Sequence, residues 1–203
     1  MTMDDDTHAQ LVTRRLEAGI AAWADLARQI SSADSRGRVD AAGREVLRAL
    51  GAGRTLLVAG NGGSAAIASH VAAEFLGKCV RDRHPLPSIS LAESHSSLTA
   101  IGNDYGFEQV FLRGVQAFGR PGDVLLAMST SGTSPNVVAA LGEARRRGLV
   151  TILMTGAKGE GQHEHADHLL VVPSAETPRI QEVHMLWAHA WCEAVDLSMQ
   201  EER

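Results

Sequence analysis

From Thr55 onward, short apolar runs alternate with longer segments of helical periodicity, and this alternation constrains the fold more than any other feature of the sequence. The apolar runs lie at residues 55–59, 88–92, 123–128, 150–154 and 168–172. Helical segments are predicted at 65–76, 107–118, 135–147 and 179–199. Runs that are apolar on both faces and separated by helices are typical of a parallel sheet with helices on both sides. The sequence therefore predicts an α/β fold with a doubly wound, parallel five-stranded sheet flanked by helices.

Two further helices are predicted before the first strand. In the first, at residues 8–30, apolar side chains recur every three or four positions, at Val12, Leu16, Ile20, Trp23 and Ile30. The second follows a polar break at 31–35 that supplies N-cap candidates. We expect an N-terminal helical hairpin, with residues 1–36 serving packing or oligomerisation and residues 37–203 forming one α/β domain.

The charge balance limits the classes of partner. The 203 residues carry 19 Lys and Arg against 24 Asp and Glu, a formal net charge of −5, so no basic surface for nucleic acid is expected. The N-terminus MTMDDDTHAQ has neither the basic nor the apolar region of a secretory signal, and no apolar run reaches the length of a membrane span. We expect a cytoplasmic protein that binds neither nucleic acid nor membrane. The two cysteines, Cys79 and Cys192, are interpreted as small buried side chains.

Two loops rich in glycine and hydroxyl groups follow the first and third predicted strands. The first, Gly60–Ser64, runs into a helix, and the second, Ser129–Ser134, is followed by Pro135 at the start of another. Ligands of open parallel sheets bind beyond the carboxyl ends of the strands. Hydroxyls and helix N-terminal amides bind phosphate without lysine, so the loops predict a site for a phosphorylated metabolite.

These loops, together with three further motifs, resemble the SIS domain family, and within it the phosphoheptose isomerases, over about residues 37–198. The second loop reads STSGTS at 129–134, and the three further motifs are His70 and Glu74 one helical turn apart, GNDYGF at 102–107, and RIQEVH at 179–184 with His189 beyond it. The resemblance implies an SIS-type fold and isomerisation of sedoheptulose 7-phosphate to D-glycero-D-manno-heptose 7-phosphate. It also implies a homotetramer with active sites at subunit interfaces.

The resemblance assigns roles to individual positions. The substrate-binding residues it implies are Asn61, Gly62, Gly63, Glu74, Asn103, Asp104, Ser129, Thr130, Ser131, Ser134 and Gln181. The metal ligands it implies, for one Zn²⁺ per subunit, are His70, Glu74, Gln181 and His189, with Glu74 and His189 also the catalytic acid and base. Some members carry an acid just before the Arg-Ile-Gln run, where this chain has Pro178, so a role for that acid does not transfer.

The chemistry of these residue types suits the implied reaction. Isomerisation through an enediol needs a base, an acid and stabilisation of an oxyanion. Glu74 and His189 are candidates for the proton transfers, and two imidazoles, a carboxylate and an amide oxygen suit Zn²⁺, which would polarise a carbonyl. How the metal and acid–base roles divide between these side chains stays open.

Helix geometry adds a constraint on the metal ligands. On a straight helix, Gln181 and His189 lie about 12 Å apart along the axis at 1.5 Å per residue, too far for easy coordination of one ion. A bend in the helix or ligands from two subunits would relieve this distance.

Several residues with chemistry typical of functional sites are interpreted as structural. His184 lies between apolar neighbours and is interpreted as a core histidine, and the acidic and histidine-rich segment 163–168 as a solvated loop. The arginine run 145–147 ends a helix, where cations are favourable. Trp187 and Trp191 are expected to pack the last helix.

Two functions are alternatives to the isomerase. One is a non-catalytic SIS-domain protein that binds a sugar phosphate or a protein partner of the replication-initiator-associating type, which has no need of Glu74 and His189. The other, a nicotinamide-dependent oxidoreductase, matches GxGxxA formally, but the next strand ends at Glu93, beyond the spacing of the ribose-binding acid.

Overall fold

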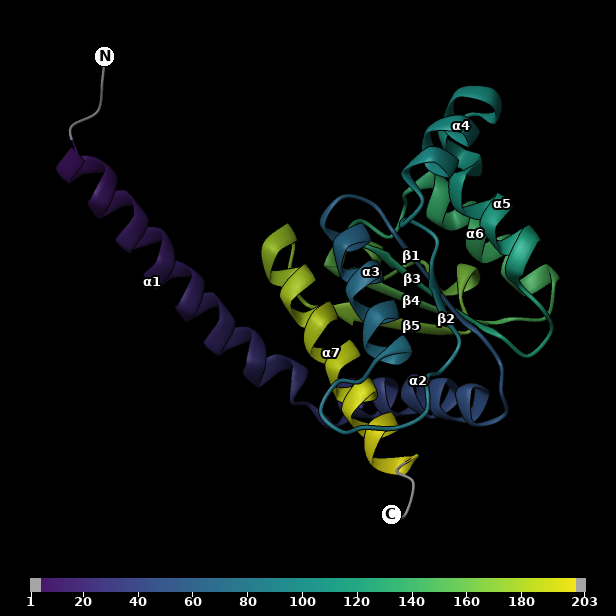
Figure 1. The fold of residues 1–203 in the computed structure, drawn as a ribbon. Coiled ribbons are helices and arrows are strands. Elements are labelled where there is room, and N and C mark those ends of the chain that lie inside the picture. The colour runs from purple at the N-terminus through teal and green to yellow at the C-terminus, as the bar shows by residue number, and fades with distance from the viewer. Residues whose placement is uncertain (1–4, 200–203) are drawn as a thin grey trace.

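The computed structural model describes residues 5–199 and has a single parallel sheet at its centre (Figure 1). The strands are β1 (Leu56–Gly60), β2 (Ser88–Ser90), β3 (Val124–Ser129), β4 (Val150–Gly156) and β5 (His168–Val172). They are ordered β2-β1-β3-β4-β5, and every neighbouring pair is parallel. The predicted fold class is confirmed, with all five strands at or near their expected positions.

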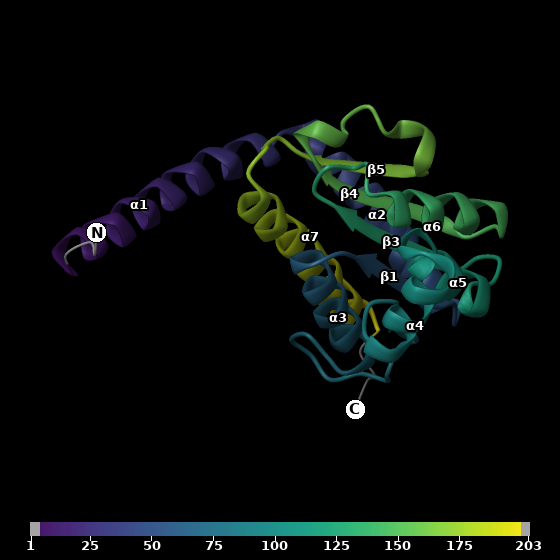
Figure 2. The same cartoon turned by 90° about the horizontal axis from the view of Figure 1, so that it is seen from above.

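Helices cover both faces of the sheet (Figure 2). The first face packs against α2 (Ala33–Gly51), α3 (Gly63–Leu76) and α7 (Thr177–Ser198). The second packs against α4 (His95–Tyr105), α5 (Val110–Phe118) and α6 (Pro135–Arg146). Successive strand residues point to opposite faces, so each face has its own hydrophobic core: Val58 packs in the core on the first face and Leu57 in the core on the second. Both faces are buried, which is why the strands are apolar throughout.

One helix was missed by the sequence reasoning. Helix α4 begins after Ser94, whose side chain accepts a hydrogen bond from Ser97 N, and each of its residues keeps some solvent exposure. Its apolar pattern is therefore weak. The helix predicted at 107–118 begins instead with a short 3₁₀ turn, Phe107–Gln109, because Gly106 adopts a positive φ of 90° between α4 and the next helix.

The first helix, α1 (Asp5–Ile30), projects away from the body of the molecule (Figures 1 and 2). Its last turns are buried at Leu26 and Ile30, and Arg179 of α7 donates a hydrogen bond to Gly19 O at 3.0 Å. The two predicted N-terminal helices are thus present, but α1 does not fold back along α2 as a hairpin. The predicted division at residue 36 falls inside α2 and stays a prediction.

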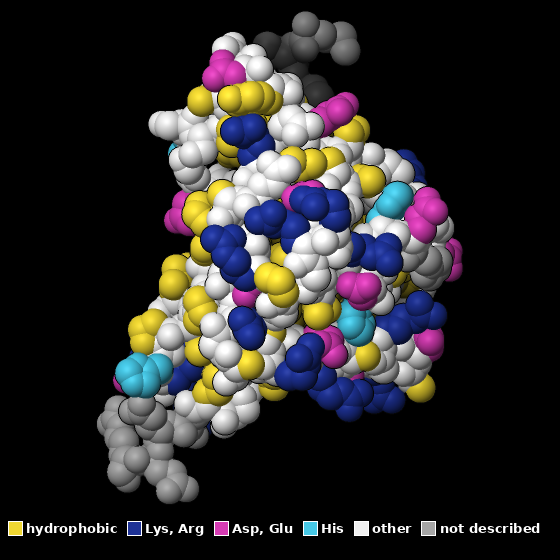
Figure 3. Space-filling model, turned by 90° about the vertical axis from the view of Figure 1, so that its right-hand side faces the viewer, with side chains coloured by type: hydrophobic (Ala, Val, Ile, Leu, Met, Phe, Trp, Pro, Cys, Tyr) yellow, Lys and Arg dark blue, Asp and Glu magenta, His cyan; other side chains and the backbone are white. Residues whose placement is uncertain are grey.

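The structural interpretations of several conspicuous side chains are confirmed. Trp187 and Trp191 are buried in the first core, and the Trp191 indole donates to Val39 O. Lys and Arg side chains gather on the side of the molecule shown in Figure 3. In the arginine run that ends α6, Arg146 pairs with Glu143 at 2.7 Å. Asp167, expected in a solvated loop, is exposed and also accepts hydrogen bonds from Thr151 N and Oγ1, which join the starts of β4 and β5.

Among the described residues, no helix combines the length and the apolar character that a membrane crossing requires.

His184 is a core histidine, as expected from its sequence neighbours. It is fully buried, its Nε2 lies 3.4 Å from Thr155 O, and its ring stacks on Trp187. Burial lowers the pKa of this imidazole from 6.5 to about 4, so the native protein holds it neutral.

We predict that His184 makes the protein acid-sensitive. Its contribution to stability is complete above pH 6.5 and is lost as the pH falls towards 4, because the unfolded chain takes up the proton first. Between pH 7 and pH 5 we expect a loss of about 2 kcal/mol in the free energy of unfolding that His184→Gln does not show. Denaturant titrations of both proteins at the two pH values measure it, and an identical pH dependence in both would contradict the prediction.

Candidate functional site

The two loops predicted to bind phosphate lie side by side at the carboxyl edge of the sheet. They follow β1 and β3, which are neighbours, and the chain leaves β1 towards β2 on its other side. Strand order therefore reverses between β1 and β3, and this is where open α/β sheets form a ligand-binding crevice.

The first loop brings backbone amides to the edge of the sheet. Gly60 packs so closely on the next helical turn that an added Cβ would lie 2.7 Å from the Cβ of Ser64. Gly62 has φ 56° and is the N-cap of α3, a conformation that favours glycine. Gly62 therefore adds no side chain of its own over the amide end of the α3 dipole.

The second loop brings hydroxyl groups together. Ser129 Oγ lies 2.9 Å from Ser134 Oγ and 3.4 Å from Ser131 Oγ. Ser134 is the N-cap of α6, yet its hydroxyl pairs with Ser129 rather than with the helix amides. Gly132, with φ 75°, makes the turn and packs against Gly159. Hydroxyls beside a helix N-terminus form an arrangement suited to a phosphate group.

A residue that sequence reasoning missed ties the two loops together. Asn136, in the first turn of α6, is almost fully buried and forms two reciprocal hydrogen bonds with Asn61, of 2.9 and 2.8 Å. Asn61 was predicted to bind substrate, and its amide is held in place by this pair. The only sequence signal was an amide next to Pro135 at the start of a helix, which is too common to indicate such a contact.

Three predicted metal ligands come together on α3 and α7, which run side by side (Figure 1). His70 Nε2 lies 3.1 Å from His189 Nε2 and 3.7 Å from Glu74 Oε1. One ligand atom from each of the three residues lies within 4.8 Å of the others. Four-coordinate zinc with bonds of about 2.1 Å holds its ligand atoms about 3.4 Å apart, so these three donors fit zinc in kind and in spacing.

Gln181 lies at the other end of the same helix pair. A Cβ added at Gly63 would lie 2.6 Å from Gln181 Nε2, so the Gln181 amide contacts the start of α3. His70 is seven residues, about 10.5 Å, further along α3. Within one chain the structure therefore separates Gln181 from the other three predicted ligands, and its ligand role stays a prediction.

Asn103 and Asp104 lie apart from the other predicted site residues. They occupy the exposed end of α4, on the second face of the sheet, where Asn103 Nδ2 donates to Asp104 Oδ1 at 2.9 Å. The hydrogen bonds among the described residues leave this pair unconnected to the two loops. Their predicted substrate contacts remain untested in the single chain.

Comparisons with known proteins agree with the family that the sequence motifs resemble. The SIS domain model matches residues 20–156. A phosphoheptose isomerase from a Bradyrhizobium species is 46% identical over 192 residues, covering 95% of this chain and 96% of the relative. One from a Roseiflexus species is 53% identical over 150 residues, covering 74% of this chain and 76% of the relative.

Solved structures extend the similarity to the fold. A phosphoheptose isomerase from Neisseria gonorrhoeae superimposes with a TM-score of 0.84 at 39% identity, covering 92% of this chain and 99% of that one. One from Francisella tularensis gives a TM-score of 0.86 at 32% identity, covering 92% and 98%. The Bradyrhizobium relative and both solved structures match more than nine-tenths of this chain. The chain therefore belongs to the SIS-domain family and, within that family, to the phosphoheptose isomerases.

Proposed function

We propose that this protein isomerises sedoheptulose 7-phosphate to D-glycero-D-manno-heptose 7-phosphate at the site formed by the two loops and by α3 and α7. The observation that carries the proposal is the meeting of Glu74 and His189, from two separate helices, beside His70. Ligand atoms of Glu74 and His189 lie within 4.8 Å of each other, and a carboxylate and an imidazole placed together can act as the base and acid of an aldose–ketose isomerisation.

The distance along α3 between the two loops and His70 suits a substrate as long as an open-chain heptose phosphate. The loops that would bind the phosphate lie at the start of α3, and His70 lies about 10.5 Å further along the helix axis. Six carbon–carbon bonds of ~1.5 Å extend roughly 8 Å, and the phosphate adds to this length. An open-chain heptose phosphate held at the loops would therefore bring its carbonyl end near Glu74 and His189.

The proposed reaction is a proton transfer between adjacent carbons. A base removes a proton from C1 of the ketose, the C2 carbonyl becomes the hydroxyl of an enediol, and a proton returned to C2 with loss of the O1 proton gives the aldose. Glu74 and His189 are the groups we assign to these transfers, as a pair. Asn61 and the serine hydroxyls hold the phosphate end so that the reacting carbons stay within reach.

We further propose that His70, Glu74 and His189 hold one Zn²⁺ per subunit. When bound, the ion would supply Lewis-acid polarisation of the sugar carbonyl. Helix α7 runs without interruption from Thr177 to Ser198, so Gln181 of the same chain stays two turns from His189. A glutamine ligand for this ion would come from a second subunit.

Assembly of the chain into a homotetramer with sites at subunit interfaces is part of the proposal. The projecting helix α1 leaves large apolar side chains exposed along its length, at Leu11, Val12, Leu16 and Ile20, with 49 to 68% of their surface accessible. An unpartnered apolar stripe of this kind marks an interaction surface. We assign it to the α1 helices of other subunits in a cytoplasmic enzyme.

A non-catalytic SIS-domain protein is not favoured. The relatives at 46 and 53% identity are both named as isomerases. Glu74 and His189 lie together at the site, whereas a binding module has no need of that pair.

Replacing Glu74 tests the proposed chemistry. We expect Glu74→Gln to lower kcat for sedoheptulose 7-phosphate by about 10²- to 10⁴-fold, the usual contribution of a positioned acid–base group, while binding of the sugar phosphate stays measurable. Glu45→Gln, at a surface carboxylate that pairs with Arg48 on α2, is the matched control and should retain full activity. Turnover by Glu74→Gln close to that of the control would remove Glu74 from the mechanism.

Replacing Ser131 tests the phosphate site separately. A hydrogen bond to a charged group contributes about 1.5–3 kcal/mol, so Ser131→Ala should raise KM about 10- to 100-fold with kcat little changed. Ser198→Ala removes a hydroxyl bonded to Val195 O near the end of α7 and should leave both constants unaltered. Steady-state kinetics measures both variants, and an effect of Ser131→Ala on kcat alone would argue against the phosphate assignment.

A further inference from the structure

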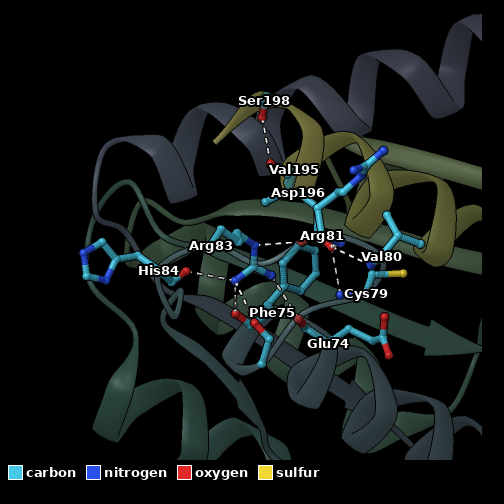
Figure 4. A network of polar contacts seen from close by, with 11 residues as sticks. Glu74, Phe75, Cys79, Val80, Arg81, Arg83, His84, Val195, Asp196 and Ser198 are labelled. Carbon is cyan, nitrogen blue, oxygen red and sulfur yellow. Dashed lines mark hydrogen bonds and ion pairs between the residues drawn. The ribbon is translucent and has the colours of Figure 1, made fainter. Parts of the chain in front are cut away.

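A buried carboxylate on α7 binds the segment that leaves α3. This segment, residues 77–84, is called the strap here (Figure 4). Asp196 Oδ2 accepts hydrogen bonds from three consecutive backbone N–H groups of the strap, those of Cys79 at 2.9 Å, Val80 at 2.7 Å and Arg81 at 3.0 Å. These donors outweigh the effect of burial, which alone would raise the pKa, and hold the pKa of Asp196 below its usual value.

Arg83, also on the strap, completes the network around Asp196. Its Nε donates to Asp196 Oδ1 at 2.8 Å, and both side chains are fully buried. Its remaining donors bind the carbonyl groups that end α3: Nη2 donates to Glu74 O at 2.9 Å and Nη1 to Phe75 O at 2.9 Å. A cation that binds the last carbonyls of a helix satisfies groups with no intrahelical partner and interacts favourably with the helix dipole.

The network joins α3 to α7 close to the proposed metal ligands. Arg83 binds the carbonyl of Glu74 itself, which is a proposed ligand. Asp196 follows His189 by seven residues, two turns along the same face of α7. The position of Glu74 on one helix is therefore tied to that of His189 on the other through the Arg83–Asp196 ion pair and the strap amides that bind Asp196.

The strap also places a thiol against Glu74. Cys79, half-buried rather than fully buried as the sequence suggested, has its pKa raised to about 12, first by burial and then by the neighbouring Glu74 carboxylate. The Glu74 side chain is thus bordered by the strap as well as by His70.

We propose that Arg83 and Asp196 are positioning residues that fix the alignment of α3 with α7 and so hold Glu74 and His189 at metal-binding distance. Apolar contacts between helices tolerate small sliding movements, whereas hydrogen bonds of fixed direction do not. Burying an ion pair is costly and often adds no net stability, so a role in geometry accounts for its presence better than a role in stability. Removing a residue that orients a metal ligand commonly lowers metal affinity about 10- to 100-fold. This inference rests on the metal site in the proposed function.

The test is zinc affinity of the full chain, measured by competition with a chromophoric chelator, together with steady-state kinetics. Asp196→Asn replaces the carboxylate by an amide, which has one acceptor oxygen and an NH₂ group that cannot accept from the strap N–H groups or from Arg83 Nε. We therefore expect zinc affinity to fall about 10- to 100-fold and kcat to fall with it. KM should change little, because the phosphate loops lie at the opposite end of α3. Asp123→Asn is the matched control: Asp123 is also buried and accepts from Thr55 N and Arg120 N, and neither of these partners lies on α3, on α7 or on the strap.

A second variant keeps the inference testable if Asp196→Asn fails to fold. Arg83→Met combined with Asp196→Leu replaces the pair with apolar side chains and leaves no unpaired buried charge. The strap amides lose their acceptor in this variant, so we expect thermal stability below that of the wild type, but a folded protein that still binds zinc weakly.

The outcomes separate the inference from the function on which it rests. Zinc affinity and kcat at wild-type levels in a folded Asp196 variant, or equal losses in the Asp123 control, would assign Arg83 and Asp196 to general stability and overturn the inference alone. A folded wild-type chain that binds no zinc would overturn the metal site and the inference with it, while sedoheptulose 7-phosphate turnover by that same protein would leave the isomerase intact.

Discussion

The parallel packing of α3 against α7 on one face of the sheet is the contact on which the rest of the site depends. At its first end Gly63 meets Gln181, beside the loops that follow β1 and β3. Two turns further, His70 meets His189, and at the far end Arg83 and Asp196 fasten the last turn of α3 to α7. The groups proposed to bind phosphate and those proposed to transfer protons thus lie along one helix pair, at a separation that matches an extended sugar phosphate. The sheet fixes where the pair begins, and the buried ion pair fixes its alignment.

The sequence carried enough information to predict this framework. Strands buried on both faces must be apolar throughout, so Leu56–Gly60, Val124–Ser129 and Val150–Gly156 were visible as short runs between helices. Their predicted parallel arrangement places both loops at one edge of the sheet. The spacing of His70 and Glu74 put both on one face of a helix, and the resemblance to phosphoheptose isomerases added His189, which the structure brings into contact with His70.

The features that sequence reasoning missed depend on contacts between residues far apart in the chain. Asn136 pairs with Asn61 across 75 positions, and Asp196 binds the strap across more than 100. No local pattern marks either residue, because each is a polar side chain that becomes buried only after folding. Helix α4 was missed for a different reason: it packs weakly, and its apolar periodicity is correspondingly faint. The direction of α1 could not be derived either, since a mainly exposed amphipathic helix is oriented by a few contacts such as that of Arg179 with Gly19.

The central claim is that a zinc ion held by His70, Glu74 and His189 supports isomerisation of sedoheptulose 7-phosphate. The most direct measurement is turnover of this sugar phosphate by the purified protein as isolated, after removal of divalent metal, and after addition of Zn²⁺, with zinc content determined at each stage. The account predicts an aldose product, loss of turnover with the metal, and recovery when about one zinc per chain is restored. Unchanged turnover by protein shown to contain no metal would contradict the zinc site, and absence of product from folded, zinc-loaded protein would contradict the proposed reaction.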